Sequence, residues 1–148
     1  MTFFKGHQEF KVDAKGRVSI PAKMRKSVAK EANDTFAVTR GLDGCIEAYP
    51  LDEWKKKEEQ YEKLNQYDPK IRFYLRTVSM WTEEVALDSQ QRIMLPKSLL
   101  DFAKINKDVL VLGNGDHIEF WDPEEHKQYL AKQTESIEAI AETLMGNR

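Results

Sequence analysis

Two arginines, each four positions after an aspartate, are the side chains of this sequence best suited to bind a charged ligand: Arg17 follows Asp13, and Arg92 follows Asp88. A guanidinium group can donate two parallel hydrogen bonds to a phosphate or to O6 and N7 of guanine. An aspartate accepts hydrogen bonds from nearby backbone N–H groups and so shapes a tight loop. Two interpretations of Arg17 remain open: an ion pair with Asp13 that only holds the loop, or a nucleic-acid contact made with help from Lys15.

The two Asp-x-x-x-Arg pairs belong to an internal repeat. Residues 10–25 read FKVDAKGRVSIPAKMR, and residues 85–100 read VALDSQQRIMLPKSLL, with Asp, Arg and Pro aligned 75 positions apart. Apolar residues alternate with polar ones beside the first loop, so residues 10–12 and 18–20 are expected to pair as a hairpin, and Gly16 permits a positive φ in its turn. The proline after each arginine starts a short helix. Further strands, joined in pairs by glycine-containing turns, are predicted at 36–39, 45–49, 109–112 and 117–121.

The second loop departs from the first in two residues. Gln90 and Gln91 stand where Lys15 and Gly16 stand in the first copy. The second loop therefore lacks one cation and the permissive glycine, which makes it less suited to close approach to a nucleic-acid backbone. Three roles remain open for Arg92: a phosphate contact, a pair with its own aspartate, or a place at a subunit interface.

Helical sequence separates and follows the two copies. Residues 51–65 and 69–80 carry apolar stripes at helical spacing and are expected to form an antiparallel pair. That pair has two open roles, packing on the strands of this chain or contact with another subunit. The terminal residues carry an apolar stripe whose opposite face is acidic. The chain is expected to divide into a first repeat at 1–55, a helical connector at 56–81, a second repeat at 82–125 and a C-terminal helix at 126–148.

Charge is distributed unevenly along the chain, although the net charge is only -2. Residues 1–30 carry eight cations and two anions, for a net +6, while residues 116–148 carry three cations and eight anions, for a net -5. A basic segment that coincides with the first loop favours a phosphate-facing surface over two ordinary solvated faces.

The remaining composition bounds the compartment and the chemistry. Cys45 is the sole cysteine, which excludes an intrachain disulfide and a metal cage made of cysteines and fits a reducing compartment. We find no signal-peptide pattern and no apolar run of transmembrane length, so a cytosolic protein without membrane partners is expected. His7, His117 and His126 are scattered and lack metal-ligand or catalytic spacing. No catalytic residue, metal or cofactor is expected.

Three motifs carry a resemblance that covers nearly the whole chain: FKG at 4–6, DAKGR at 13–17 followed by Ile20-Pro21, and DSQQR at 88–92 followed by Leu95-Pro96. Together they closely resemble the MraZ family of bacterial transcription factors. The resemblance implies an α+β fold, a duplicated AbrB-like swapped-hairpin β-barrel with flanking helices, assembled into a ring of about eight subunits. It also implies sequence-specific binding of double-stranded DNA at short G-rich direct repeats, with repression of the division and cell-wall gene cluster, including its own operon.

This interpretation assigns the DNA contacts to the first loop, the basic segment before it and one arginine of the second loop. The expected DNA-binding residues are Lys5, His7, Lys11, Lys15, Gly16, Arg17 and Arg92, and the expected loop-structuring residues are Asp13 and Asp88. The protein is then expected in the cytoplasm, associated with the nucleoid. The alternative is an antitoxin-like module that binds a small toxin. That alternative predicts a disordered partner-binding tail, whereas the C-terminus has the sequence of a helix.

Overall fold

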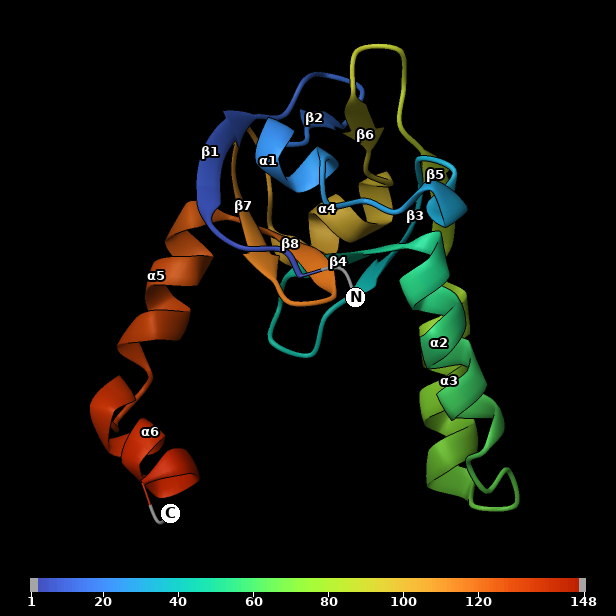
Figure 1. Ribbon diagram of the computed structural model, residues 1–148, viewed down its shortest axis with the longest axis vertical. Helices are drawn as coiled ribbons and strands as arrows, with labels where there is room; N and C mark the ends of the chain where they lie inside the picture. Colours follow the sequence, from blue (N-terminus) through green and yellow to red (C-terminus); the bar gives the residue numbers. More distant parts are fainter. Residues whose placement is uncertain (1–2, 147–148) are drawn as a thin grey trace.

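Two antiparallel β-sheets form the body of the protein, and two helical arms extend from one side of it (Figure 1). The computed structural model describes residues 3–146. The strands are β1 (His7–Lys11), β2 (Arg17–Ser19), β3 (Thr35–Arg40), β4 (Ile46–Pro50), β5 (Glu83–Ala86), β6 (Arg92–Met94), β7 (Asp108–Asn114) and β8 (His117–Trp121). The helices are α1 (Ala22–Arg25), the 3-10 helix η1 (Lys30–Ala32), α2 (Leu51–Glu62), α3 (Pro69–Trp81), α4 (Lys97–Ala103), α5 (Pro123–Ala131) and α6 (Ile137–Met145).

The strand order interleaves the two copies of the repeat. The six-stranded sheet runs β1-β7-β8-β4-β3-β5, and β2 pairs with β6 in a separate two-stranded sheet. Within residues 3–146, β1 and β5 form the edges of the larger sheet, which is therefore open. The protein is thus a mixed α+β structure built on antiparallel sheets, and strands from one copy of the repeat complete the sheet of the other.

The prediction that residues 10–12 and 18–20 pair with each other was wrong. Phe10 lies opposite Val109 in the β1–β7 ladder, and Val18 lies opposite Ile93 in the β2–β6 ladder. Only the turn between β1 and β2 closes locally, where the Asp13 N–H donates to Arg17 O at 3.1 Å. An alternating pattern shows which face of a strand is buried, but it does not identify the neighbouring strand.

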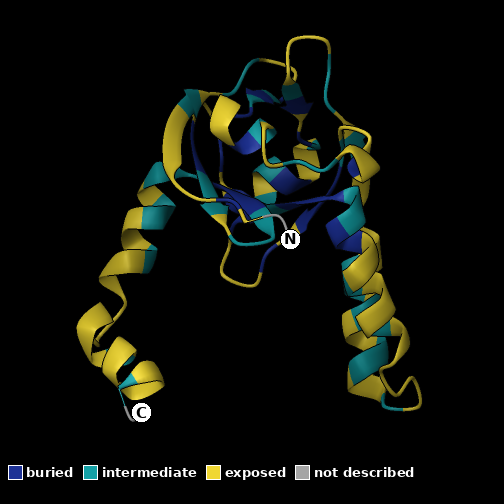
Figure 2. Ribbon diagram, in the orientation of Figure 1, coloured by how far each residue is buried: buried dark blue, intermediate teal, exposed yellow. Residues whose placement is uncertain are grey.

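The two later strand pairs match the predicted arrangement. β3 pairs with β4, β7 pairs with β8, and both ladders are antiparallel. Their inward side chains form the main core, where Phe36, Ile46 and Phe120 are fully buried. Figure 2 shows this burial concentrated in the strands, while the arms remain largely exposed. Each such side chain contributes roughly 1.5–3 kcal/mol of transfer free energy on burial.

The predicted antiparallel helical pair is confirmed as the arm formed by α2 and α3 (Figure 1). Tyr61 links the two helices, because its ring contacts Trp54 on α2 and Tyr74 on α3 with centroid separations of 6.1 and 5.9 Å. Asp68 caps α3 by accepting a hydrogen bond from the Lys70 N–H at 2.9 Å. The other arm consists of α5 and α6. None of the described helices is both long and apolar enough to cross a membrane.

Candidate nucleic-acid interface

The two Asp-x-x-x-Arg loops lie side by side at the end of the body opposite the helical arms (Figure 1). Backbone hydrogen bonds join them: the Leu95 N–H donates to Gly16 O at 2.9 Å, and the Ile20 N–H donates to Gln91 O at 3.3 Å. The β2–β6 ladder lies directly behind the loops. Residues that are far apart in sequence therefore share one surface.

Asp13 organises the first loop through both carboxylate oxygens. Its Oδ1 accepts hydrogen bonds from the backbone N–H groups of Lys15 at 3.0 Å and Arg17 at 2.8 Å. Its Oδ2 accepts one from Arg17 Nε at 2.6 Å. These bonds, led by that from the Arg17 backbone, hold the pKa of Asp13 below its ordinary value, because they stabilise the ionised carboxylate.

Asp88 repeats this geometry in the second loop. Its Oδ1 accepts from the backbone N–H groups of Gln90 at 2.8 Å and Arg92 at 2.9 Å, and its Oδ2 accepts from Arg92 Nε at 2.9 Å. The pKa of Asp88 is likewise lowered, first by the Arg92 backbone hydrogen bond. The pair with its own aspartate that was left open for Arg92 is therefore present.

The two arginines differ in how much they can offer to a ligand. The Arg17 side chain is 32% exposed, and no described residue accepts a hydrogen bond from its terminal amino groups. The Arg92 side chain is 24% exposed and also places Nη1 3.7 Å from Asp13 Oδ2. Arg17 thus forms the ion pair of the first interpretation and still keeps its two Nη groups for the second.

Gly16 and Gln91 occupy equivalent positions in the two loops. Both have positive φ, +83° at Gly16 and +63° at Gln91, so the second loop adopts the left-handed conformation without glycine. Comparing the sequences of the two loops therefore overestimated the difference in backbone conformation between them. What sets Gly16 apart is space, because a Cβ there would lie 2.7 Å from Leu95 O and 3.2 Å from Leu100 Cδ1.

We predict that Gly16→Ala lowers the free energy of unfolding by about 2–4 kcal/mol, through left-handed strain and overpacking against the Leu95 carbonyl. Gln91→Ala is the matched control and should change it by less than about 0.5 kcal/mol, since Gln91 is an exposed non-glycine residue already. Urea denaturation followed by circular dichroism measures both. Equal stability of the two variants would contradict the steric argument.

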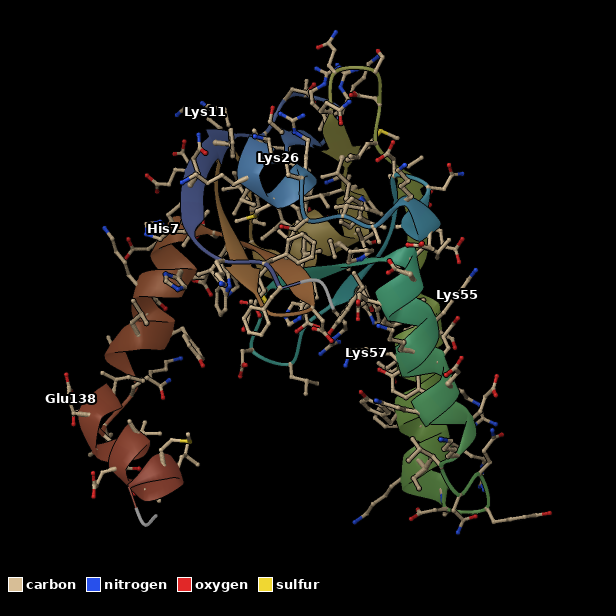
Figure 3. All side chains as sticks on the ribbon, in the orientation of Figure 1. His7, Lys11, Lys26, Lys55, Lys57 and Glu138 are labelled. Atoms are coloured by element: carbon tan, nitrogen blue, oxygen red, sulfur yellow. The ribbon has the colours of Figure 1, made fainter. Side chains whose placement is uncertain are left out.

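The other predicted DNA-binding residues are spread along β1. Lys15 is exposed beside Arg17, and Lys11 lies at the loop end of the strand, where its Nζ contacts Asp108 Oδ1 at 2.6 Å. His7 begins β1 and lies at the far end beside α5, and Lys5 precedes it (Figure 3). The structure therefore brings together Asp13, Lys15, Gly16, Arg17, Asp88 and Arg92, with Lys11 close by. It separates Lys5 and His7 from this group.

Lys26 was not among the predicted DNA-binding residues. Lys26 follows α1, is exposed and lies at the same end of the body as Lys11 (Figure 3). The excess of cations in residues 1–30 indicated a basic segment, but it did not identify Lys26 individually.

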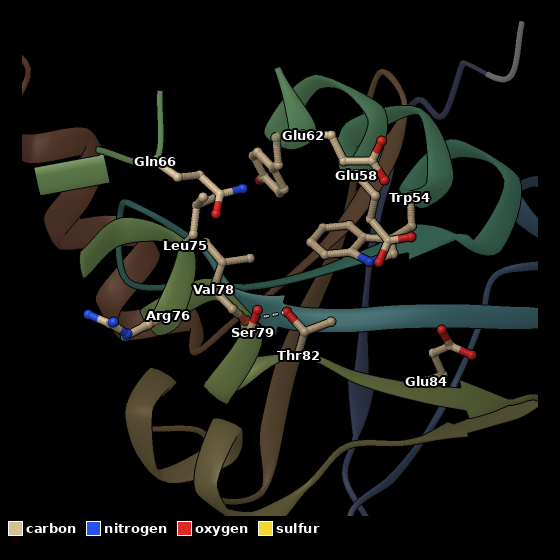
Figure 4. A pocket seen from close by; sticks show the side chains of 11 residues that line it. Trp54, Glu58, Glu62, Gln66, Leu75, Arg76, Val78, Ser79, Thr82 and Glu84 are labelled. Carbon is tan, nitrogen blue, oxygen red and sulfur yellow. Dashed lines mark hydrogen bonds between the residues drawn. The ribbon is translucent and has the colours of Figure 1, made fainter. Parts of the chain in front are cut away.

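A hollow of about 760 Å³ lies beside the α2–α3 arm (Figure 4). Its apolar lining includes Trp54, Leu75 and Val78, and Glu58, Glu62 and Glu84 also line it. Arg76 is the one arginine or lysine among the described lining residues, and the three carboxylates outnumber it, which disfavours a phosphate ligand. This hollow is therefore separate from the candidate interface in both position and charge.

The fold and its paired loops define a class of α+β protein in which two interleaved copies of one unit present arginines on a single surface. A family model described as "MraZ protein, putative antitoxin-like" matches residues 3–77 and 79–148. Three proteins named "Transcriptional regulator MraZ" are similar over nearly the full length. Those from Natranaerobius thermophilus, Clostridium acetobutylicum and Acetivibrio thermocellus are 39%, 37% and 36% identical, over 95–96% of this chain and 96% of theirs. The chain belongs to the MraZ family.

Proposed function

We propose that this protein is a sequence-specific regulator of transcription that binds double-stranded DNA through its paired loops. The observation that carries the proposal is the pair of aspartate-tethered loops, hydrogen-bonded side by side, with an arginine at the base of each. Relatives that cover the whole chain are named transcriptional regulators. Lys11, Lys15 and Lys26 of the basic segment lie at the loop end, and the acidic terminal helices extend from the other end. The loop end is therefore the one suited to face DNA.

In this proposal Arg17 reads guanine in the major groove, and the lysines contact phosphate. The hydrogen bond from Arg17 Nε to Asp13 fixes the direction of the guanidinium before DNA arrives, so less side-chain entropy is lost on binding. Lys15, Lys11 and Lys26 are exposed around the loops and are suited to phosphate contacts. Arg92 completes the surface from the second loop, while Lys5 and His7 would reach only DNA that extends along β1.

We further propose that the body is a duplicated AbrB-like swapped-hairpin barrel and that subunits assemble into a ring of about eight. The exchange of strands between the repeats supports the first part. Exposed apolar side chains on both arms support the second, among them Phe73, Met80, Ile137 and Leu144. A ring multiplies a weak contact by many identical loops, so overall affinity exceeds that of one subunit.

The proposed targets are short G-rich direct repeats upstream of the division and cell-wall gene cluster. Binding there would repress that cluster together with the protein's own operon, in the cytoplasm at the nucleoid. Direct repeats suit a ring, because successive subunits present the same loops in the same orientation.

The test is a gel-shift titration of the purified protein against its own upstream DNA and against a base-permuted copy. We expect preference for the native DNA and a fall in affinity of about 10³–10⁵-fold between 50 and 200 mM salt, as for six to ten phosphate contacts. Lys15→Ala should weaken both DNAs alike and flatten the salt dependence. Equal affinity for the two DNAs, or binding insensitive to salt, would exclude the proposal.

The words "antitoxin-like" in the family description keep a second function in view. A toxin-binding module of that kind needs a segment that folds onto its partner. Here the C-terminal residues form α5 and α6, each with a side-chain cap, from Asp122 and Ser136. Co-purification of a small protein in equimolar amount, together with absence of DNA binding, would favour this function.

A further inference from the structure

Four side chains with metal-binding atoms converge at the end of the body away from the loops. Cys45 precedes β4, Glu47 lies on β4, and His117 and Glu119 lie on β8. Cys45 Sγ and one carboxylate oxygen from each glutamate all lie within 4.8 Å of one another. His117 Nε2 is 2.9 Å from Glu119 Oε2 and 3.8 Å from Glu47 Oε2.

This arrangement is costly for a protein that only needs to fold. Glu47 and Glu119 are direct partners in the β4–β8 ladder, where like charges repel. Cys45 is 2% exposed, and its Sγ lies close to the two carboxylates. A metal ion bound between these carboxylates would offset their repulsion.

The residues around the cluster orient it as the surroundings of a metal site do. Asp116 Oδ1 lies 2.8 Å from His117 Nδ1, and Nε2 of the same ring faces Glu119 Oε2 at 2.9 Å. A metal ion at Nε2 requires the neutral ring with its hydrogen on Nδ1, where Asp116 accepts it. A carboxylate behind the distal nitrogen is the usual partner of a metal-binding histidine. Glu119 is fixed by hydrogen bonds from Asn114 Nδ2 at 3.0 Å and Trp121 Nε1 at 2.9 Å.

Space and access are also present. Gly41 borders the cluster, and a Cβ there would lie 2.9 Å from Cys45 Sγ and 3.1 Å from Glu47 Oε2. A cavity of about 440 Å³ reaches Glu47, His117 and Glu119 from outside and extends toward the α2–α3 arm. A hydrated ion can therefore enter and exchange its water for protein ligands.

We propose that Cys45 Sγ, His117 Nε2 and carboxylate oxygens of Glu47 and Glu119 bind a divalent metal ion of intermediate softness, Zn²⁺ in the first place. One sulfur, one nitrogen and two oxygens suit a tetrahedral Zn²⁺ ion. As the metal–sulfur bond forms, the thiol proton passes to solvent, and the histidine binds as neutral imidazole. The ion would join β4 of the first repeat to β8 of the second and so stabilise the interleaved fold.

The test uses the full chain, freed of metal with a chelator and titrated with Co²⁺ as a spectroscopic probe for the Zn²⁺ site. We expect a near-ultraviolet thiolate-to-Co²⁺ charge-transfer band and visible bands of tetrahedral Co²⁺, both lost when Zn²⁺ is added. Cys45→Ser should remove the charge-transfer band. Asp116→Asn should weaken Zn²⁺ binding by about 10–100-fold, as loss of an orienting carboxylate does. His126 lies outside the cluster, so the His126→Gln variant should bind Zn²⁺ as tightly as the wild type does.

The wild-type spectrum decides the matter even if a substitution prevents folding. A charge-transfer band at one Co²⁺ per chain, together with a rise in Tm on Zn²⁺ addition, supports the site. Absence of the band, or Zn²⁺ binding by folded Cys45→Ser as tight as by the wild type, overturns it. DNA binding does not enter either result, so the proposed metal site and the proposed function fail independently.

Discussion

Replacing Arg17 with alanine is expected to abolish specific DNA binding while the protein remains folded. A bidentate arginine–guanine contact discriminates by about 1–3 kcal/mol, or roughly 5–150-fold for a single loop. When several subunits bind tandem sites together, this loss is multiplied, and gel shifts on the upstream DNA should show no specific complex. The fold should survive, because the Arg17 side chain is partly exposed and its partner Asp13 can be solvated.

Two further arginine variants sharpen this prediction. Arg92→Ala should weaken binding less than Arg17→Ala, because Arg92 is more buried and is shared between two aspartates. Arg76→Ala is the matched control, because Arg76 is an exposed arginine on α3, in an arm that extends away from the loops. This variant should bind DNA as tightly as the wild type does. Gel filtration checks whether all three variants assemble as the wild type does. Wild-type affinity in an Arg17→Ala protein of normal oligomeric size would remove Arg17 from the interface.

A fragment ending at Trp81 is expected not to fold as a monomer. Of the strands in residues 3–81, β1, β2 and β4 pair with β7, β6 and β8, which the fragment lacks, and only the β3–β4 ladder lies within it. A lone two-stranded hairpin is marginal in water at best. Circular dichroism should therefore show no cooperative thermal transition for the monomeric fragment.

Mixing this fragment with residues 82–148 provides the control. The missing strands return in the second piece, so the mixture should regain a cooperative transition and elute as a complex in gel filtration. A monomeric fragment of residues 1–81 that melts cooperatively would show that the interleaved pairing is dispensable for folding.

Interactions between residues close together in the chain were enough to predict the loops and most of the helices and strands. The Asp13 and Arg17 spacing predicted a tethered loop, and the apolar stripe of residues 69–80 predicted α3, because both depend on residues close together in the chain. Pairing between Phe10 and Val109 depends on residues far apart in the chain, and alternation alone does not encode it. The repeat indicated equivalence of the copies, not their exchange of strands.

The predicted residues lie together where the prediction rested on the repeated loop, and they lie apart where it rested on charge. Lys15 and Arg17 lie together, whereas Lys5 and His7 entered the prediction because they were basic and near in sequence. The Cys45 and Glu119 cluster could not be found by ligand spacing, since these residues lie 74 positions apart and meet only through the β4–β8 ladder.

The two hydrogen-bonded loops differ in sequence, so the surface that they form is asymmetric. A homodimer of identical halves would possess a true twofold axis and would favour palindromes. Covalent fusion permits one tip to carry Lys15 and Gly16 while its neighbour carries Gln90 and Gln91, with nearly the same backbone shape. If the protein binds DNA as proposed, each subunit is asymmetric along the double helix, and head-to-tail repeats match it better than palindromes.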